Sequence, residues 1–301
     1  MSNFYMMVGL PGSGKSTWAR RFKGLFNFSV LSSDEYREKY LGNVEDQSKN
    51  NYIFNLIYKD TIELLNSGKN VCFDATNISR KDRRQILLEI DKNCKNVFKF
   101  CIVLMVDDNV VRKQNQSREK VVPEYVIDRM LRKFEFPLYS EGFDRINIFA
   151  TYDLNLIFDE IPSYKEMYKM MKGFNQENPH HSLTLDKHCK KCKRLIHTKN
   201  KALKIAASIH DFGKLFTKSY DEKNNSCHYY NHENIGAYKA FFYEYPKGVE
   251  AEDACKYINY HMQPYRIAKC KKDKAKREVL FFDKDFYNDI LELHRADILA
   301  H

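Results

Sequence analysis

A glycine-rich turn near the start of the sequence constrains the fold more than any other feature. Residues 4–8 are largely apolar and run directly into GLPGSGKST at residues 9–17. The spacing Gly9-x4-Gly14-Lys15-Ser16 is typical of a phosphate-binding loop between a buried strand and a helix. Its glycines let successive backbone N–H groups face an anion, and the following helix adds the positive end of its dipole.

This loop predicts a site for ATP, or another nucleoside triphosphate, together with Mg²⁺. Lys15 would supply a cation for the β- and γ-phosphates, and the Ser16 hydroxyl would be a ligand of Mg²⁺. The residues expected to hold the nucleotide are Gly9, Gly12, Ser13, Gly14, Lys15, Ser16 and Thr17.

Apolar runs alternate with helix-length segments through the first half of the chain. Further strands are expected at residues 28–31, 70–74, 98–106 and 154–158, and helices at residues 16–22, 47–66, 79–91 and 123–133. Strands separated by helices indicate a doubly wound parallel sheet, so we expect an α/β phosphotransferase domain over residues 1–165.

Polar residues follow the second expected strand. Asp34 lies at the carboxyl end of that strand, the edge of a parallel sheet at which ligands bind, and could accept a proton from an attacking hydroxyl. Arg37 follows three residues later on the same helix face and could reach a phosphate of the acceptor. Capping of a helix by Ser33 or Asp34 explains the same residues equally well.

The third strand ends in Asp74-x-Thr76-Asn77. Asp74 could order Mg²⁺ or Arg37, and Thr76 and Asn77 could touch an acceptor, although an ordinary turn uses the same residue types. In the next helix we expect Arg80, Arg83 and Arg84 to be mostly solvated.

A basic segment follows the fourth strand. Arg112 and Arg118 lie between that strand and Pro123, which begins a new helix. Arginines on such a segment can close over the phosphates as a lid and offset the charge that develops during phosphoryl transfer.

The second half of the chain, from about residue 164, has mainly helical periodicity and most of the histidines. His210 and Asp211 are adjacent at the end of an apolar helix, and adjacent helical residues point about 100° apart. Both reach one site only if the helix ends there or if two metal ions share the aspartate. His188, His232, His261 and Asp297 each fall in a separate helical segment, as ligands of a helical bundle do.

This set of nitrogen and carboxylate ligands suits one or two ions of Mn, Fe, Co, Ni or Zn, which can activate water for phosphoester cleavage. Lys214, one turn after the pair, is placed to hold a phosphate. Cys189-x2-Cys192 has the local spacing of a zinc site, but no second pair follows, so we favour reduced thiols.

Composition limits the setting in which the chain works. It has 301 residues, a formal net charge of +10 and eight scattered cysteines. These values favour a cytoplasmic protein with reduced thiols and a polyanionic partner, and no apolar run approaches the length of a membrane span. The basic runs at residues 190–204 and 269–277 could follow a nucleic-acid backbone, with tyrosines for stacking at 229, 230, 260 and 265, or could be solvated helix faces.

The first-half motifs resemble the kinase domain of polynucleotide 5′-kinases over roughly residues 1–160. The resemblance implies that Asp34 is the general base on a 5′-hydroxyl, that Arg37 contacts the adjacent phosphate of the acceptor, and that Lys15 and Ser16 hold ATP and Mg²⁺. The lid of that family often reads Arg-Asn-x-x-Arg, whereas Gln114 stands before Asn115 here. Arg118 therefore matches, and Arg112 is expected to replace the first arginine.

The second-half series resembles the HD phosphohydrolase superfamily over roughly residues 175–301. It implies a metal-ligand set, a pocket lined by His180 and His181, and His301 in place of a basic residue that some relatives carry after the last ligand. The ligands it implies are His188, His210, Asp211, His232, His261 and Asp297.

Together the two resemblances imply an end-healing enzyme. Such an enzyme phosphorylates 5′-hydroxyl ends and removes 2′,3′-cyclic, 2′- or 3′-phosphates, so its partners would be RNA or DNA ends and a ligase acting downstream. One alternative is a nucleoside or nucleotide kinase joined to an HD nucleotidase. A second is a nucleotide-gated regulatory protein whose second half is a sensor. The sequence does not indicate an oligomeric state.

Overall fold

A computed structural model describes residues 1–118, 120–151, 161–178 and 182–301. It divides the chain into two compact units. The first unit comprises Met1–Ile127 and Pro137–Asp153, and the second comprises Asp128–Phe136 and Leu154–His301. Neither unit is therefore one continuous stretch of sequence.

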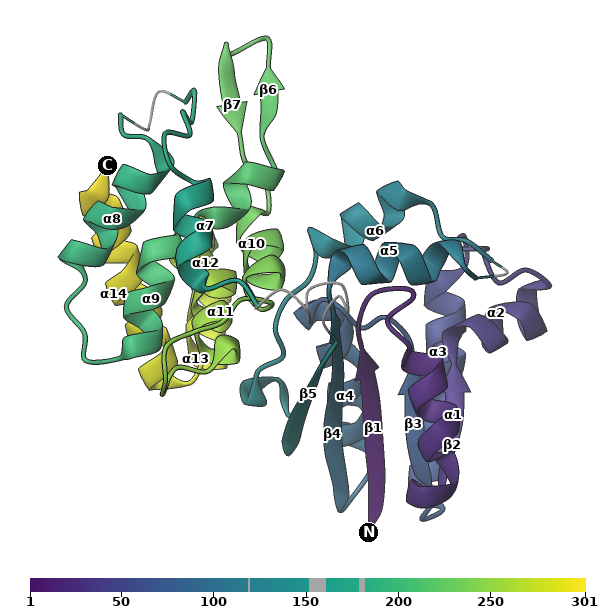
Figure 1. Ribbon diagram of the computed structural model, residues 1–301. Coiled ribbons are helices and arrows are strands. Elements are labelled where there is room, and N and C mark those ends of the chain that lie inside the picture. Colours follow the sequence, from purple (N-terminus) through teal and green to yellow (C-terminus); the bar gives the residue numbers. More distant parts are fainter. Residues whose placement is uncertain (119, 152–160, 179–181) are drawn as a thin grey trace. The chain divides into compact units, whose positions relative to one another are not determined.

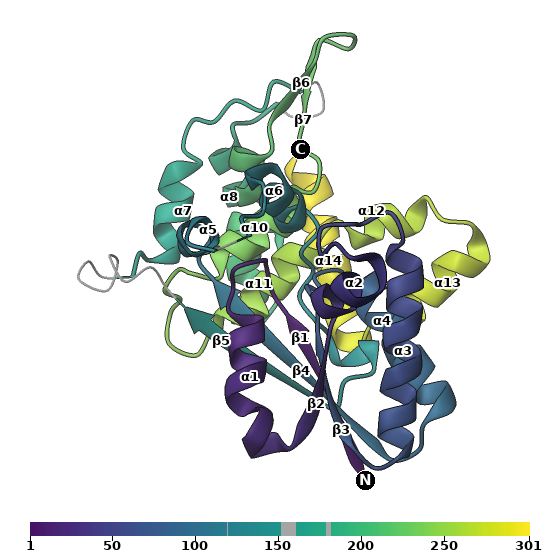
Figure 2. The same ribbon diagram turned by 90° about the vertical axis from the view of Figure 1, so that its right-hand side faces the viewer.

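A parallel sheet with helices on both faces forms the first unit (Figures 1 and 2). Its strand order is β2-β3-β1-β4-β5, and every pairing is parallel. The elements are β1 (Ser2–Val8), α1 (Lys15–Phe26), β2 (Phe28–Ser32), α2 (Ser33–Leu41), α3 (Asn50–Asn66), β3 (Asn70–Asp74), α4 (Arg80–Asn93), β4 (Val97–Val106), α5 (Asp108–Gln116), α6 (Glu124–Leu131), the 3-10 turn η1 (Tyr139–Glu141) and β5 (Arg145–Thr151).

The two faces of the sheet are covered by different helices because side chains alternate along each strand. Tyr5 and Met7 face α1, where Trp18 joins the cluster. Side chains on the opposite face of the sheet pack against α3. There the Phe73 ring of β3 contacts the rings of Phe54 and Tyr58. The predicted α/β class is confirmed. The fifth paired strand is Arg145–Thr151, whereas the expected strand at residues 154–158 lies outside the described residues.

Helices make up most of the second unit, as predicted (Figure 1). They are α7 (Tyr164–Met170), α8 (Leu185–Leu195), α9 (Lys201–Ile209), the 3-10 segment η3 (Phe212–Phe216), α10 (His232–Ala240), α11 (Ala251–Tyr260), α12 (Gln263–Ala268), α13 (Lys272–Phe281) and α14 (Lys284–Ala300), with a hairpin of β6 (Ser219–Asp221) and β7 (Ser226–His228).

Residues 128–136 pack into the helical unit although they precede β5 in the chain. The Phe136 backbone N–H donates to Asn259 Oδ1 at 2.7 Å, and the Phe134 ring meets Tyr238 edge-on at 5.0 Å. Both phenylalanines are fully buried. The segment is thus part of the core of the second unit.

No described helix combines the length and apolar character needed to cross a bilayer. Among the described residues no disulfide joins any of the eight cysteines, and Cys72, Cys101, Cys189 and Cys192 are buried.

Candidate active sites

The glycine-rich loop leaves β1 and begins α1 at Lys15. A side chain on Gly9 would place its Cβ 2.9 Å from the Leu104 carbonyl oxygen, so the loop can pass over β4 only with glycine there. Gly12 and Gly14 have φ of +82° and +85°, a region that L side chains rarely adopt. Ser16 and Thr17 are exposed in the first turn of α1, where they can meet a ligand.

Lys15 is buried and is held by its own loop. Its Nζ donates to the carbonyl oxygens of Gly9 at 3.0 Å and Leu10 at 2.7 Å. Burial lowers the pKa of Lys15 to about 8, against the opposing effect of the Asp74 and Asp34 carboxylates, while Arg118 lowers it further. The charges of Asp74, Asp34 and Arg118 therefore all act on the ammonium group of Lys15.

The hydroxyl oxygen of Ser13 is buried and makes no hydrogen bond within the described part of the chain. A buried hydroxyl without a partner is costly, and a bound phosphate would supply one. The loop thus fits the nucleotide that its sequence predicts.

Asp34 and Arg37 form an ion pair on the first turns of α2. Arg37 Nη1 lies 3.1 Å from Asp34 Oδ1, and the two side chains are 7% and 57% exposed. Asn50 accepts a second bond from Arg37 Nη2 at 2.9 Å, and the Phe54 ring lies beneath the guanidinium at 5.9 Å. Arg37 Nε is buried and finds no acceptor among the described residues.

The N-cap of α2 is Ser32, not Ser33 or Asp34, and no side chain caps it. Asp34 belongs to the first helical turn instead. The capping alternative therefore does not account for Asp34 or Ser33.

Two residues after β3 hold the loop to the sheet. The Thr76 carbonyl oxygen accepts from the Gly9 backbone N–H at 3.1 Å, and Asn77 Nδ2 donates to the Met7 carbonyl oxygen at 2.8 Å. Asn77 is buried, with φ of +45°. Contact of Thr76 and Asn77 with an acceptor stays a prediction, while the observed bonds tie β3 to the phosphate loop.

Arg83 corrects the expectation that the arginines of α4 are solvated. It is fully buried and makes a two-point ion pair with Glu141, with N–O distances of 2.7 Å. Its Nη1 also donates to the carbonyl oxygens of Asn77 and Ile78 at 3.1 Å. Arg83 lies on the face of α4 that also buries Ile86, Leu87 and Ile90, so the helical spacing of these apolar residues was a signal that the arginine is buried.

The arginines of the expected lid differ in their surroundings. Arg112 forms an ion pair with Glu124, and its Nε lies 3.8 Å from Asp108 Oδ2. Arg118, in contrast, is exposed to solvent. Asn115 is fully buried, and its side chain makes two hydrogen bonds with the backbone of Val122, at 2.7 and 3.0 Å. Asn115 was expected only as a position of the lid motif, yet its side chain closes the loop that carries Arg118.

Six elements of the second unit bring the six expected ligands together. His188 comes from α8, His232 from the start of α10 and Asp297 from α14, while His261 caps α11. His210 is the C-cap of α9, and Asp211 is the N-cap of η3. The α-helix therefore ends between the two adjacent residues, which lets both side chains reach one centre.

The two carboxylate oxygens of Asp211 face different groups of histidines. Oδ2 lies 3.5 Å from His188 Nε2 and 3.4 Å from His210 Nε2. Oδ1 lies 3.1 Å from His232 Nε2 and 3.8 Å from His261 Nε2. We call the side with His188, His210 and Asp297 the first ligand group, and the side with His232 and His261 the second.

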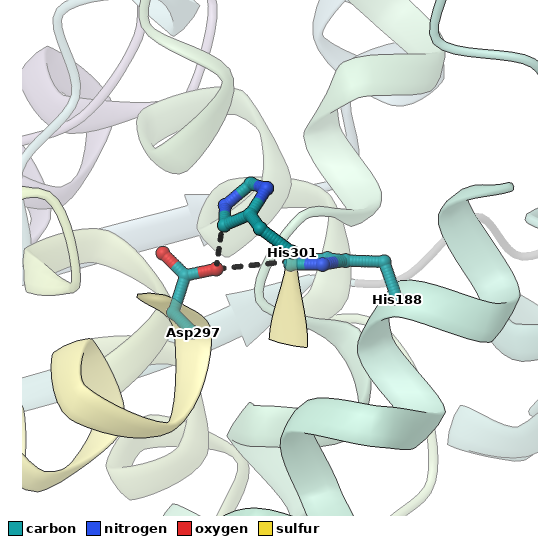
Figure 3. Close-up of side chains that lie close together, drawn as sticks. All are labelled: His188, Asp297 and His301. Carbon is teal, nitrogen blue, oxygen red and sulfur yellow. Dashed lines mark ion pairs between the residues drawn. The ribbon is translucent and has the colours of Figure 1, made fainter. Parts of the chain in front are cut away.

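Asp297 completes the first ligand group. Its Oδ1 lies 3.0 Å from His188 Nε2 and 3.4 Å from His210 Nε2, and its Oδ2 accepts from the Tyr265 hydroxyl at 3.2 Å. Figure 3 shows its carboxylate beside His188 and His301. Tyr265 was expected only as a stacking residue, but it orients this carboxylate.

Backbone carbonyls orient three of the imidazoles. The Nδ1 atoms of His210, His232 and His261 lie 3.1, 2.8 and 2.7 Å from the carbonyl oxygens of the residues three positions earlier. A proton held at Nδ1 leaves Nε2 free as a metal ligand. All three Nε2 atoms point to Asp211, so the donor set fits one or two transition-metal ions.

Charges are strongly coupled in this centre. Burial opposes ionisation of Asp211, but Lys214, His210 and His232 outweigh it and hold the pKa of Asp211 well below its usual range. Burial and the neighbouring charges of His210 and His232 lower the pKa of His261 to about 3. A carboxylate and a neutral imidazole are the forms that bind a cation.

Lys214 is buried beside this centre. Its Nζ lies 2.8 Å from Asp211 Oδ2 and donates to Gln176 Oε1 at 2.8 Å. His180 and His181 lie outside the described residues. Among described residues, the clusters of three or more side chains that could bind a metal contain no cysteine.

Two of the four tyrosines expected to stack on bases are structural. Tyr260 is fully buried and donates to the Phe136 carbonyl oxygen, and Tyr229 is buried and donates to the Gln176 carbonyl oxygen. Tyr230 is 66% exposed and could still stack on a base.

Each half of the chain matches a known domain family. Residues 4–137 match an AAA domain, and residues 180–298 match an HD domain. The chain thus has an N-terminal P-loop kinase fold with a parallel sheet, followed by a helical HD domain.

Among curated proteins, an L-seryl-tRNA(Sec) kinase of Methanococcus maripaludis is 30% identical over 176 residues. The match covers 54% of this chain, and the chain spans 65% of the length of that protein.

Two solved structures are similar to part of the chain. A chain of the Pnkp1/Rnl/Hen1 RNA repair complex is 24% identical, with 43% of this chain and 42% of that chain covered and a TM-score of 0.38. A fungal RNA kinase is 16% identical, with 49% and 73% covered and a TM-score of 0.38.

Proposed function

We propose that this chain heals broken RNA ends with two separate active sites. The first unit phosphorylates 5′-hydroxyl ends with ATP and Mg²⁺. The second unit removes 2′,3′-cyclic, 2′- or 3′-phosphates with a transition metal.

The pairing of Asp34 with Arg37 carries the kinase part of the proposal. Asp34 is a half-exposed carboxylate that can take the proton of an attacking hydroxyl, and Arg37 is a buried cation whose Nε makes no hydrogen bond within the described residues. A 5′-terminal nucleotide of RNA offers both a hydroxyl and a nearby phosphodiester. A free nucleoside offers only the hydroxyl, so this pair favours a polynucleotide acceptor.

In the proposed reaction the 5′-hydroxyl oxygen attacks the γ-phosphorus in line, and its proton passes to Asp34. The bond from the γ-phosphorus to the β-γ bridging oxygen breaks, and ADP leaves. Lys15 balances charge on the β- and γ-phosphates, Ser16 is positioned to bind Mg²⁺, and the exposed Arg118 approaches the transferred group when the lid closes.

The divided contacts of Asp211 support hydrolysis in the second unit. Bound ions would activate water and offset negative charge on a phosphoester. Within the protein, Asp211 links the two ligand groups, Asp297 completes the first, and Lys214 is a cation within 2.8 Å of the shared carboxylate that can turn to a substrate phosphate. The net charge of +10 favours a polyanionic substrate.

The relative from Methanococcus maripaludis favours a second candidate acceptor. That protein is an L-seryl-tRNA(Sec) kinase, so the first unit of this chain could act on a hydroxyl carried by a charged tRNA rather than on a 5′ end. Serylated tRNA is therefore included among the acceptors in the test.

The test offers the protein an RNA oligonucleotide with a 5′-hydroxyl and a 2′,3′-cyclic phosphate, with ATP, Mg²⁺ and one of Mn, Co, Ni or Zn. Both ends are expected to be converted. Conversion of mononucleotides but not of the oligonucleotide would favour a small-molecule enzyme, and ATP binding without any transfer would favour a regulatory protein.

Paired variants separate the two sites. Lys15→Ala is expected to abolish only phosphorylation and Asp211→Ala only phosphate removal, while Arg21→Ala on the exposed face of α1 retains both activities. Loss of both activities from either single change, in a folded protein, would contradict two independent sites.

A further inference from the structure

We propose that His301 is an additional metal ligand, which binds the same ion as His188 and Asp297. The ligand series from His188 to Asp297 does not include it. The proposal concerns metal binding, so it holds or fails independently of whether the second unit acts on RNA.

The geometry of three side chains supports this assignment (Figure 3). His301 Nε2 lies 3.7 Å from Asp297 Oδ1, the same oxygen that His188 Nε2 approaches to 3.0 Å. One potential ligand atom from each residue lies within 4.8 Å of the other two. His301 follows Asp297 by four positions, one turn later, so both side chains lie on one face at the end of α14.

The separation suits two ligands of one ion better than a hydrogen bond. A distance of 3.7 Å is longer than an N–H···O bond, which is about 2.7–3.2 Å. Two atoms that are each about 2.1 Å from one ion lie about 3.0 Å apart at a right angle and about 4.2 Å apart on opposite sides. The distances from Asp297 Oδ1 to His188 and to His301 both fall in this range.

Contacts with α8 hold His301 in place. Lys191 Nζ donates to the backbone carbonyl oxygen of His301 at 3.1 Å, and the His301 ring packs against the His188 ring with centroids 4.8 Å apart. Lys191 follows His188 by three positions, so one face of α8 supplies both contacts. The end of α14 is therefore fixed against the helix that provides the first ligand.

His301 makes the two ligand groups more unequal than Asp297 alone does. The first has three imidazoles and two carboxylate oxygens, from Asp211 and Asp297, and the second has two imidazoles and one oxygen of Asp211. More imidazole ligands favour Fe, Co, Ni or Zn over Mn. We therefore expect one ion to bind more tightly than the other, and His301 to contribute to the tighter site.

The experiment measures metal binding directly. Tag-free protein is stripped with a chelator and titrated with Co²⁺, and visible absorption reports the ligand set while equilibrium dialysis gives affinity and stoichiometry. His301→Ala is expected to weaken the tighter site by about tenfold or more, a loss that even an outer-shell partner can cause. The absorption bands of the bound Co²⁺ should change as well.

A matched histidine provides the control. His228 Nε2 lies 3.4 Å from Asp221 Oδ2, and its side chain is 32% exposed against 30% for His301. His228→Ala removes a similar exposed histidine from a similar His–Asp pair in the β6–β7 hairpin, so it should leave Co²⁺ binding unchanged. His301→Gln, which keeps a side chain of similar size, should show the same loss as His301→Ala, and circular dichroism checks that each variant is folded.

Two results would overturn the proposal. In the first, both His301 variants bind Co²⁺ with the same affinity and the same absorption bands as the unsubstituted protein. The other is unchanged Co²⁺ binding in the His301 variants while inorganic phosphate inhibits their phosphate removal less than it does in the unsubstituted protein. That result would make His301 a phosphate contact.

Discussion

The buried pair of Arg83 and Glu141 should make the first unit sensitive to changes that leave its active site untouched. Arg83→Met removes the guanidinium and leaves the Glu141 carboxylate buried without its partner. Both side chains are 0% exposed, so water cannot replace the lost contacts.

The size of the stability loss in Arg83→Met follows from the groups that lose their partners. Removing one member of a buried ion pair typically costs about 3–5 kcal/mol of unfolding free energy. Arg83→Met also takes a donor from the carbonyl oxygens of Asn77 and Ile78, which places the expected loss in the upper part of that range. The total free energy of unfolding of a domain is about 5–15 kcal/mol, so this loss is a large fraction of it.

The double variant Arg83→Met/Glu141→Met should lose less than the sum of the two single variants, because no unpaired charge stays buried. Some loss remains, since the Leu138 backbone N–H donates to Glu141 Oε1 at 3.0 Å and would lose its acceptor. The expected coupling free energy in the double-mutant cycle is about 3 kcal/mol.

Tryptophan fluorescence provides the assay because the chain has one tryptophan. Trp18 packs against Phe22 in α1, with ring centroids 4.6 Å apart, so its emission during urea unfolding reports the first unit. Lys81→Met, an exposed change on the same helix as Arg83, serves as the control and should shift stability by less than about 0.5 kcal/mol. A loss below about 1 kcal/mol in Arg83→Met, or strict additivity in the cycle, would refute the reasoning.

Two further predictions concern the two sites. Because the pKa of Lys15 is about 8, about three quarters of these side chains are neutral at pH 8.5 in the free protein, and bound phosphates should raise that pKa. Binding of ATP should therefore take up protons at pH 8.5 but not at pH 7, as calorimetry in buffers of different ionisation enthalpy can measure, and equal heats in those buffers at pH 8.5 would contradict it. Gly213→Ala would place a Cβ 1.9 Å from the His232 carbonyl oxygen, so it should displace that ligand, weaken metal binding by the second ligand group and lower the rate of phosphate removal while phosphorylation persists. Retained metal affinity would count against this reading, and Gly24→Ala, which meets nothing within 4 Å, is the control.

Local patterns predicted the parts of this molecule that depend on short stretches of sequence. The phosphate loop and the buried strand before it could be read directly, because one spacing rule sets the turn and one apolar run sets the strand. Strand β5 was missed because RINIFAT mixes polar and apolar residues and is partly exposed at the sheet edge.

Long-range pairing explains the other differences. The apolar spacing of α4 places Arg83 on the buried face of that helix, but its partner Glu141 lies 58 positions away, and no local pattern identifies it. In the second unit the order of His and Asp residues predicted a shared centre. The division of Asp211 between two ligand groups, and the approach of His301, depend on where α9 and α14 end in space.

The entry of residues 128–136 into the helical unit has a consequence for synthesis of the chain. The Phe136 backbone N–H finds its acceptor, Asn259, 123 positions later. At about 5–20 residues per second, a ribosome needs roughly 6 to 25 s to make that partner after Phe136 itself. During this interval Phe134 and Phe136 lack their final cover. The nascent chain therefore presents an apolar segment that chaperones can bind.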